Sequence, residues 1–252
     1  MKHFQRLISG QPVIHEEDLA DADLLCLLIE KGADATMSDD GGWTLLHSAA
    51  QLEETPQSAK ILLDNGALIN APLKKTIERK EGWGEEGDTP FHIAAKYNKT
   101  TVIIEILLAY QADVNLPNIW GWVPLHYAGE FNTNPEVIKI LIKNGAFVDM
   151  WDNWQGTPFY YAAGMNPNLE VIKVFLDNDA DINSSRINGY VPFHHAAWKN
   201  PNLEIIKHLV ENGAYVHERG AYGVAPVHLA IKYNPNPLVV EYIKGLADNE
   251  TD

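Results

Sequence analysis

Histidines recur at a regular spacing along this 252-residue chain, and side chains of this type could take part in chemistry if the fold brought them together. Imidazole binds zinc and transfers protons near neutral pH, so convergent histidines would suggest a metal centre or a general base. Successive members of the series lie at least 34 residues apart, so only the fold could bring them together. The series is His47, His92, His126, His194 and His228.

These histidines stand in similar strings, such as Thr89-Pro-Phe-His92 and Val123-Pro-Leu-His126. The last residues of successive strings are 45, 34, 34, 34 and 34 residues apart, and Tyr160 ends the fourth string in place of His. Strings of the type Asn-Gly-Ala follow at a fixed distance. A fixed period of this length is typical of a protein built from stacked structural units.

Each unit is predicted to hold two short helices. Thr89 is a suitable N-cap residue, and the proline after it fits the first helical position. The second helix shows apolar residues at helical spacing in the segment 137–142, and Gly145 ends it. Between the helices lie connectors such as Asn200-Pro-Asn202, in which the first Asn is suited to end one helix and the second to cap the next. Neither helix can bury its apolar face alone, so neighbouring units must stack.

The pattern resembles the ankyrin repeat, whose signature includes Thr-Pro-Leu-His-x-Ala, a helix and Gly-Ala-Asp-Val-Asn. The resemblance covers residues 18–246 and implies an all-α ankyrin repeat solenoid of stacked helix-turn-helix units with short β-hairpin loops. We expect a capping repeat at 1–36, six repeats at 37–247 with an insertion near 72–84, and a short acidic tail at 248–252. The usual unit has about 33 residues, so the 34-residue spacing fits one extra residue in the connector.

The resemblance implies that the repeated histidine bonds to the backbone of adjacent loops. In the geometry that the resemblance implies, successive copies would lie about 10 Å apart, too far to share a zinc ion with bonds of about 2 Å. His195 is expected on a helix surface. The sequence contains no Ser-His-Asp order, phosphate loop, HExxH or CxxC motif. We therefore predict no catalytic residue, no metal site, no cofactor and no enzymatic activity, and we read Tyr160 and the displaced Gly156 as tolerated variation.

Aromatic residues are concentrated where the resemblance implies a concave surface, formed by the hairpin tips and the exposed side of each first helix. Five of the seven tryptophans fall in hairpin segments. Large exposed apolar side chains mark interaction sites, and Trp and Tyr are frequent anchors there. Packing between neighbouring hairpins is the alternative for some of these rings. The predicted partner-binding residues are Trp43, Tyr97, Trp120, Trp122, Phe131, Trp151, Trp154, Tyr190, Trp198, Tyr222 and Tyr233.

The first spacing is 45 residues rather than 34, so 11 extra residues lie between Asn70 and Thr89. Segment 73–83 is basic and amphiphilic, and we expect it to project as a finger from the tip edge beside the concave face. A surface loop without a binding role is the alternative, because loop insertions cost little. The finger residues that could meet an acidic partner are Lys74, Lys75, Arg79, Lys80 and Trp83.

Composition limits the function further. The formal net charge is −15, which argues against binding nucleic acid or an anionic membrane surface and favours a basic or neutral partner. The longest apolar run, Leu24–Ile29, is far shorter than the about 20 residues of a membrane span. It contains the single cysteine, Cys26, which we expect to be buried. A lone thiol fits a reducing cytoplasm, or a host cytoplasm for a secreted effector.

Together these features predict a monomeric protein-protein interaction module that binds another protein through an aromatic concave face, as an adaptor, inhibitor or effector. The alternative is a reader of a small cationic ligand or modified peptide, in which the rings and a carboxylate such as Glu130 form a cation–π cage. A degraded enzyme is the third reading, and too few residues lie outside the repeats to support it.

Overall fold

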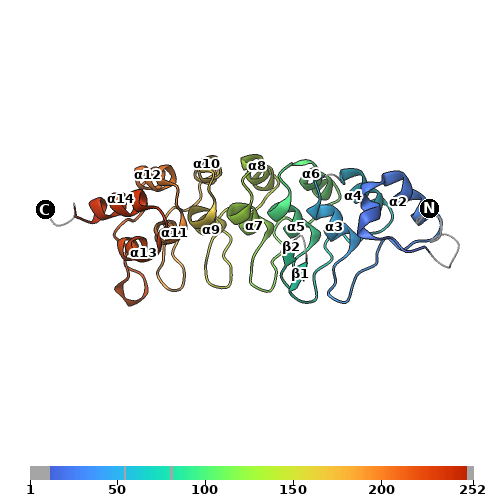
Figure 1. Ribbon diagram of the computed structural model, residues 1–252, viewed down its shortest axis with the longest axis horizontal. Helices are drawn as coiled ribbons and strands as arrows, with labels where there is room; N and C mark the ends of the chain where they lie inside the picture. The colour runs from blue at the N-terminus through green and yellow to red at the C-terminus, as the bar shows by residue number, and fades with distance from the viewer. Residues whose placement is uncertain (1–11, 54, 80–81, 249–252) are drawn as a thin grey trace. The chain divides into compact units, whose positions relative to one another are not determined.

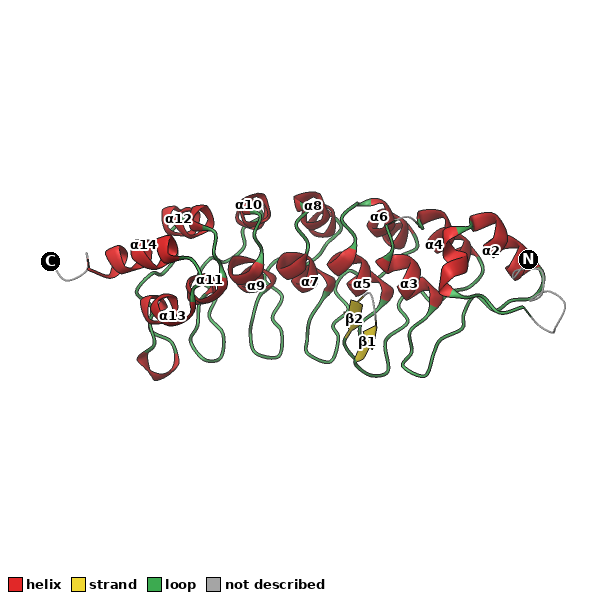
Figure 2. Cartoon of the chain, in the orientation of Figure 1, coloured by secondary structure: helices red, strands yellow, loops and turns green. Residues whose placement is uncertain are grey.

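The computed structural model describes residues 12–53, 55–79 and 82–248 of the chain. These residues form two compact units, one that ends at Ile119 (unit 1) and one that begins at Trp120 (unit 2). The division was not predicted from the repeat period. Each unit is built from pairs of short helices joined by long loops, coloured red and green in Figure 2.

Unit 1 opens with a short 3-10 helix and contains helix pairs that stack on one another, with α3 against α5 and α4 against both α2 and α6. A small two-stranded antiparallel sheet lies between α4 and α5 in the sequence. The elements are η1 (Glu16–Ala20), α2 (Ala22–Glu30), α3 (Leu45–Gln51), α4 (Pro56–Asp64), β1 (Ile77–Arg79), β2 (Gly82–Gly84), α5 (Pro90–Tyr97) and α6 (Val102–Ala109).

Unit 2 continues the same plan. Its first helices α7, α9, α11 and α13 pack in one row, and its second helices α8, α10, α12 and α14 pack in another. The loops that precede α9, α11 and α13 extend to the same side of the unit (Figure 1). The elements are α7 (Pro124–Phe131), α8 (Pro135–Lys143), α9 (Pro158–Met165), α10 (Leu169–Asp177), α11 (Pro192–Lys199), α12 (Leu203–Glu211), η2 (Ala221–Gly223), α13 (Pro226–Tyr233) and α14 (Pro237–Asp248).

The repeated histidines hold the starts of the first helices. In His126, Nδ1 accepts a hydrogen bond from the Val123 N–H at 3.1 Å, and Nε2 lies 3.1 Å from the Gly156 carbonyl oxygen of the next loop. His194 repeats the pattern toward Val191 and Val224. The ring therefore binds the N–H of the cap residue itself, as His92 also does for Thr89, and its other nitrogen joins one repeat to the next, as the family resemblance implied.

The Asn-Pro-Asn connectors join neighbouring repeats. Asn200 is fully buried, and its side-chain amide donates to the carbonyl oxygens of Ala163 (2.9 Å) and Asn166 (3.0 Å) in the preceding repeat. Asn202 caps α12 by accepting from the Glu204 N–H at 3.0 Å, and it donates to the Pro167 carbonyl oxygen at 3.1 Å. Both asparagines thus satisfy backbone groups of two successive connectors.

The insertion does not project as predicted. Strands β1 and β2 form a hairpin in which Ile77 pairs with Gly84, and Ile77 packs against the buried cluster of Trp43, Leu73 and Ile93. The hairpin therefore lies on unit 1 itself, because its apolar positions gain burial against α5. The expected burial of Cys26 is also wrong, since the thiol is exposed on α2.

Candidate functional site

The hairpin tips of unit 2 form an ordered row. The Asn153 N–H donates to the Trp120 carbonyl oxygen at 3.0 Å, and the Ile187 N–H donates to that of Trp154 at 3.1 Å. The Ala221 N–H continues the row by donating to the Asn188 carbonyl oxygen at 2.7 Å. These bonds hold corresponding tip residues of successive repeats next to one another, so whatever side chains they carry are presented as a line.

Aromatic residues directly before the helix cap are used for packing. The Trp43 side chain is only 4% exposed and its Nε1–H donates to the Ser48 hydroxyl at 2.7 Å, so its assignment to an open binding face is wrong. Trp122 and Tyr190 are half-buried and stack on the histidines of their own repeats, with ring centroids 5.6 and 4.7 Å apart. Each of these rings covers the histidine that fixes the helix start.

Tyr97 is also engaged within the fold. Its hydroxyl accepts from the Trp83 N–H at 2.9 Å and lies 3.1 Å from the Trp83 carbonyl oxygen, so the β1–β2 hairpin covers this ring. The Lys96 ammonium lies over the Trp83 ring. Burial raises the pKa of the Tyr97 phenol above its usual value. Trp83 and Tyr97 therefore join the insertion to α5 instead of forming separate binding elements.

Trp120 and Trp154 are the exposed pair at the tips of unit 2. They stand three residues before their helix caps, and each directly precedes the left-handed residue of its turn, Gly121 or Gln155. Their rings stack with centroids 5.6 Å apart and remain 39% and 38% exposed. Because the backbone bond between the tips fixes their separation, the pair is a preformed apolar surface that needs little ordering to bind.

Other predicted residues are exposed at separate places. Tyr222 is fully exposed at the last tip, and Phe131 is exposed at the end of α7, where it stacks on Tyr127. Trp151 is exposed and lines an open, mainly apolar hollow with Phe147. Phe147 is not among the residues predicted from the sequence, because it occupies the Asp position of the Gly-Ala-Asp-Val-Asn string.

A network of ring contacts runs from Trp122, in the hairpin before α7, to the first helices α11 and α13. Trp122 contacts Tyr161 at 4.5 Å between centroids, and Tyr161 contacts His195 at 6.1 Å. His195 contacts Trp198 at 6.2 Å, and Trp198 contacts Tyr233 at 5.8 Å. The half-buried Trp198 and the exposed Tyr233 therefore belong to the same aromatic layer, on α11 and α13 of unit 2.

A buried polar group supports this layer at its centre. Asp152 accepts from the Tyr161 hydroxyl and from the Trp122 Nε1–H, the latter at 3.2 Å. Its other oxygen accepts from the backbone N–H groups of Trp154 and Gly156 at 2.8 and 2.7 Å. Burial and the bond to Asp152 raise the pKa of Tyr161, so the phenol stays protonated and donates. Asp152 thus sets the conformation of the tip that carries Trp154.

The variation in the Tyr160 repeat is part of this arrangement. Gln155 takes the left-handed turn position with φ of 62°, so Gly156 falls where neighbouring repeats place a larger residue. A Cβ on Gly156 would come within 3.0 Å of Asp152 and 2.9 Å of Tyr161. The missing side chain leaves the room that the Tyr161 ring and its bond to Asp152 require.

His195 is buried, which corrects its expected place on a helix surface. It stacks on Tyr160 with centroids 4.8 Å apart, and Nδ1 lies 3.1 Å from the Tyr160 carbonyl oxygen. A Cβ on Gly164 would overlap the imidazole, so this glycine makes the space for it. Burial lowers the pKa of His195 to about 4, and the neutral ring donates through Nδ1.

Two of the predicted basic residues of the insertion, Lys74 and Lys75, are exposed. The hydroxyl of Thr76, the next residue, donates to the Glu85 carboxylate at 2.6 Å. Lys80 and the side chain of Arg79 lie outside the described residues.

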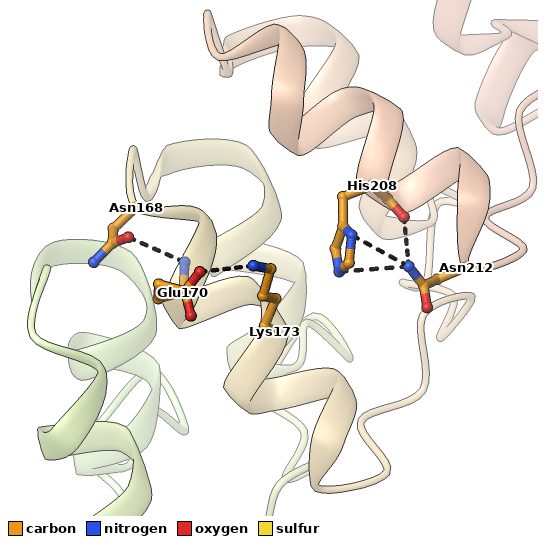
Figure 3. Close-up of polar contacts among 5 residues, drawn as sticks. All are labelled: Asn168, Glu170, Lys173, His208 and Asn212. Atoms are coloured by element: carbon orange, nitrogen blue, oxygen red, sulfur yellow. Dashed lines mark hydrogen bonds and ion pairs between the residues drawn. The ribbon is translucent and has the colours of Figure 1, made fainter.

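The second-helix face of unit 2 carries charge pairs within single helices. Figure 3 shows Glu170 paired with Lys173 at 2.7 Å beside the capping residue Asn168, and Asn212 close to His208. The Lys173 ammonium lowers the pKa of Glu170. Equivalent pairs, Glu136–Lys139 and Glu204–Lys207, occur on α8 and α12. This face is charge-compensated and well solvated, which suits it less for docking than the aromatic layer.

Across the described ranges, no group of three or more His, Cys, Asp or Glu side chains is placed to hold a metal ion. Over the same residues, we find no helix with the length and apolar character of a membrane span.

Comparison with known proteins agrees with the geometry. The family model for ankyrin repeats (three copies) matches residues 18–118, 73–152, 91–186, 133–220 and 159–252. The crystal structure of the human ASB11 ankyrin repeat domain is similar, with a TM-score of 0.74 and 24% sequence identity over 90% of this chain and 96% of that chain. A likeness at this identity concerns the fold. No curated protein sequence matches the chain.

Proposed function

Because the chain belongs to the ankyrin repeat family, whose members are generally protein-protein interaction modules, we propose that it binds a partner protein through the aromatic layer of unit 2. The contact residues of this proposal are Trp120, Trp154, Trp198, Tyr222 and Tyr233, with Phe131 at the edge.

The stacked and exposed pair of Trp120 and Trp154 carries the proposal. A solvent-exposed hairpin tip does not require tryptophan, since two other repeats have Asn188 and Glu86 at the corresponding position. Exposed Trp side chains cost solubility and are retained at interfaces, where truncation of an anchor costs about 2 kcal/mol or more.

The cationic-ligand reading gains no support from the same rings. The ammonium of Lys199 lies 4.4 Å from the Trp198 ring centroid, and that of Lys232 lies 4.9 Å from the Tyr233 centroid. These lysines would compete with a cationic ligand for the ring faces and would repel it. A protein segment that uses both the rings and the ammonium groups fits better.

Affinity capture from a lysate of the source cells tests the proposal. The bait is the full chain, and the variant carries Trp120→Ala and Trp154→Ala. Because both rings are exposed, we expect the variant to fold normally by circular dichroism and to retain at most about a tenth of the captured partner.

A matched control carries Phe147→Ala and Tyr215→Ala, which remove two exposed aromatic side chains outside the proposed layer. We expect it to capture the partner as the unaltered chain does. Equal loss in both double variants, or no loss in the tryptophan variant, would reject the aromatic layer as the binding surface.

A further inference from the structure

Charge is separated within unit 2. The hairpin and first-helix segments 186–200 and 220–234 contain Arg186, Lys199 and Lys232 and no carboxylate residue. The carboxylates of this part of the chain lie in the second helices and in the loops that follow them, as Glu204 does. Arg186 is half-buried against the Tyr160 and Tyr161 rings, so the locally basic face of this acidic chain consists of Lys199 on α11 and Lys232 on α13.

The two lysines on this face are held differently from those on the second helices. Lys139, Lys173 and Lys207 each pair with a glutamate on their own helix, at 2.7, 2.7 and 3.3 Å. Within the described residues, neither Lys199 nor Lys232 pairs with a carboxylate, and each ammonium instead lies over an aromatic ring of its own helix.

The ring contacts place both ammonium groups beside aromatic surface. Trp198 and Tyr233 are in contact, with centroids 5.8 Å apart, and each carries its lysine ammonium on one side. Tyr233 is 48% exposed and Ile231 beside it is 54% exposed. The patch therefore offers two ammonium groups next to apolar and aromatic surface, which is the complement of a carboxylate flanked by an apolar side chain.

We propose that the α11–α13 face binds an acidic peptide segment of the partner, in which one or more carboxylates meet Lys199 and Lys232 and a neighbouring apolar side chain packs on Trp198 and Tyr233. This inference rests on the proposed function and names the chemistry of the partner. It differs from the expectation drawn from net charge, because the local face is basic although the chain is acidic.

Peptide display tests the inference. Random peptides of about twelve residues are selected on the immobilised full-length protein, and a synthetic peptide of the enriched sequence is then titrated by fluorescence anisotropy. We expect enrichment of Asp or Glu beside Phe, Tyr, Trp or Leu. The Lys199→Glu and Lys232→Glu double variant should bind the synthetic peptide about tenfold or more weakly, with stronger binding at low salt.

Lys207→Glu on α12 is the matched control, since it reverses an exposed charge of the same repeat outside the patch. It should leave the Kd within about twofold. Lys199→Gln and Lys232→Gln together remove the charges without reversing them and should give an intermediate loss. Circular dichroism confirms that each variant is folded.

Enrichment of basic or uncharged peptides would overturn the inference. It would also be overturned if Lys207→Glu weakened peptide binding as much as the Lys199→Glu and Lys232→Glu double variant, or if acidic peptides were enriched no more on the unaltered chain than on that double variant. Displacement of the peptide by a single-stranded oligonucleotide would also overturn it in favour of nucleic-acid binding. If the selected peptides are uncharged but bind the Trp120→Ala and Trp154→Ala double variant more weakly than the unaltered chain, this inference fails and the proposed function still holds.

Discussion

At the scale of single residues, buried histidine separates into two roles in this chain. His126 and His194 each bridge a helix start and the next loop. His195 instead fills space above Gly164 and stacks on Tyr160. Burial lowers the pKa of His194 and of His195, so protonation of these two side chains opposes folding.

The pKa of His195 gives a stability prediction. Burial lowers it to about 4, against about 6.5 in the unfolded chain. Between these values only the unfolded chain binds the proton, so this stabilisation is complete above about pH 6.5 and decreases toward about pH 4. Over the whole window the loss is roughly 3 kcal/mol, and about 1 kcal/mol is lost by pH 6.

Urea unfolding of the chain and of His195→Phe at about pH 7.5 and about pH 6 checks this. The unaltered chain should lose about 1 kcal/mol more than the variant between the two pH values. His194 shifts in the same direction because it is also buried, and it remains in both proteins. Equal pH dependence in both would contradict the buried neutral state of His195.

Aromatic residues show how far the sequence predicts the site. Recognition of the repeat located every hairpin, and it selected Trp120 and Trp154 together with Trp43 and Trp122. It did not separate the packed tryptophans from the exposed ones, although they stand at different distances from the helix cap. A tryptophan one residue before the cap packs on histidine, whereas a tryptophan three residues before the cap is exposed. Exposure depends on the left-handed turn between the two positions, a backbone property that residue type does not reveal.

At the scale of the elements, the Asn-Pro-Asn connectors explain the 34-residue period. The sequence predicted their capping role but not the second set of bonds, in which Asn166, Asn200 and Asn234 each donate to two carbonyl groups of the preceding repeat. Those acceptors lie 34 and 37 residues away, so the bonds appear only when the repeats are stacked. The division into two units and the folding of the insertion onto α5 were likewise absent from the local pattern.

Asn200→Ala is expected to destabilise the chain by about 2–3 kcal/mol, because it leaves two buried carbonyl oxygens without their donor. Chemical denaturation measures the difference. Asn212→Ala is the matched control, since this side chain donates to a carbonyl at an exposed helix end, and it should cost less than about 1 kcal/mol. Similar costs for the two variants would refute the role of the connector ladder.

In the turn before α9, substitutions at two adjacent residues are predicted to change the stability of the chain in opposite directions. Gln155→Gly should stabilise the chain by up to about 1 kcal/mol, because glycine adopts the left-handed conformation without the Cβ conflict. Gly156→Ala should destabilise it by about 1–3 kcal/mol, because the new methyl group meets Tyr161 and Asp152. Thermal unfolding of both variants measures the signs, and stabilisation by alanine would contradict the packing described around Asp152.

At the scale of the whole molecule, the net charge leads us to expect that nucleic acid is not a partner. With a formal net charge of −15, the protein as a whole repels a phosphate backbone. We expect no salt-sensitive binding of single- or double-stranded oligonucleotides in a filter assay at about 0.1 M salt. Micromolar binding that weakens steeply with added salt would show that the basic face of unit 2 acts on nucleic acid instead of protein.

Hydroxyl-radical footprinting of the captured complex tests most directly whether the aromatic layer of unit 2 is the binding surface. We predict that the bound partner strongly reduces oxidation of Trp120, Trp154 and Trp198, while Phe147 and Tyr215, which lie outside the layer, react as in the free chain. Protection of Phe147 and Tyr215 without protection of the three tryptophans would contradict the account.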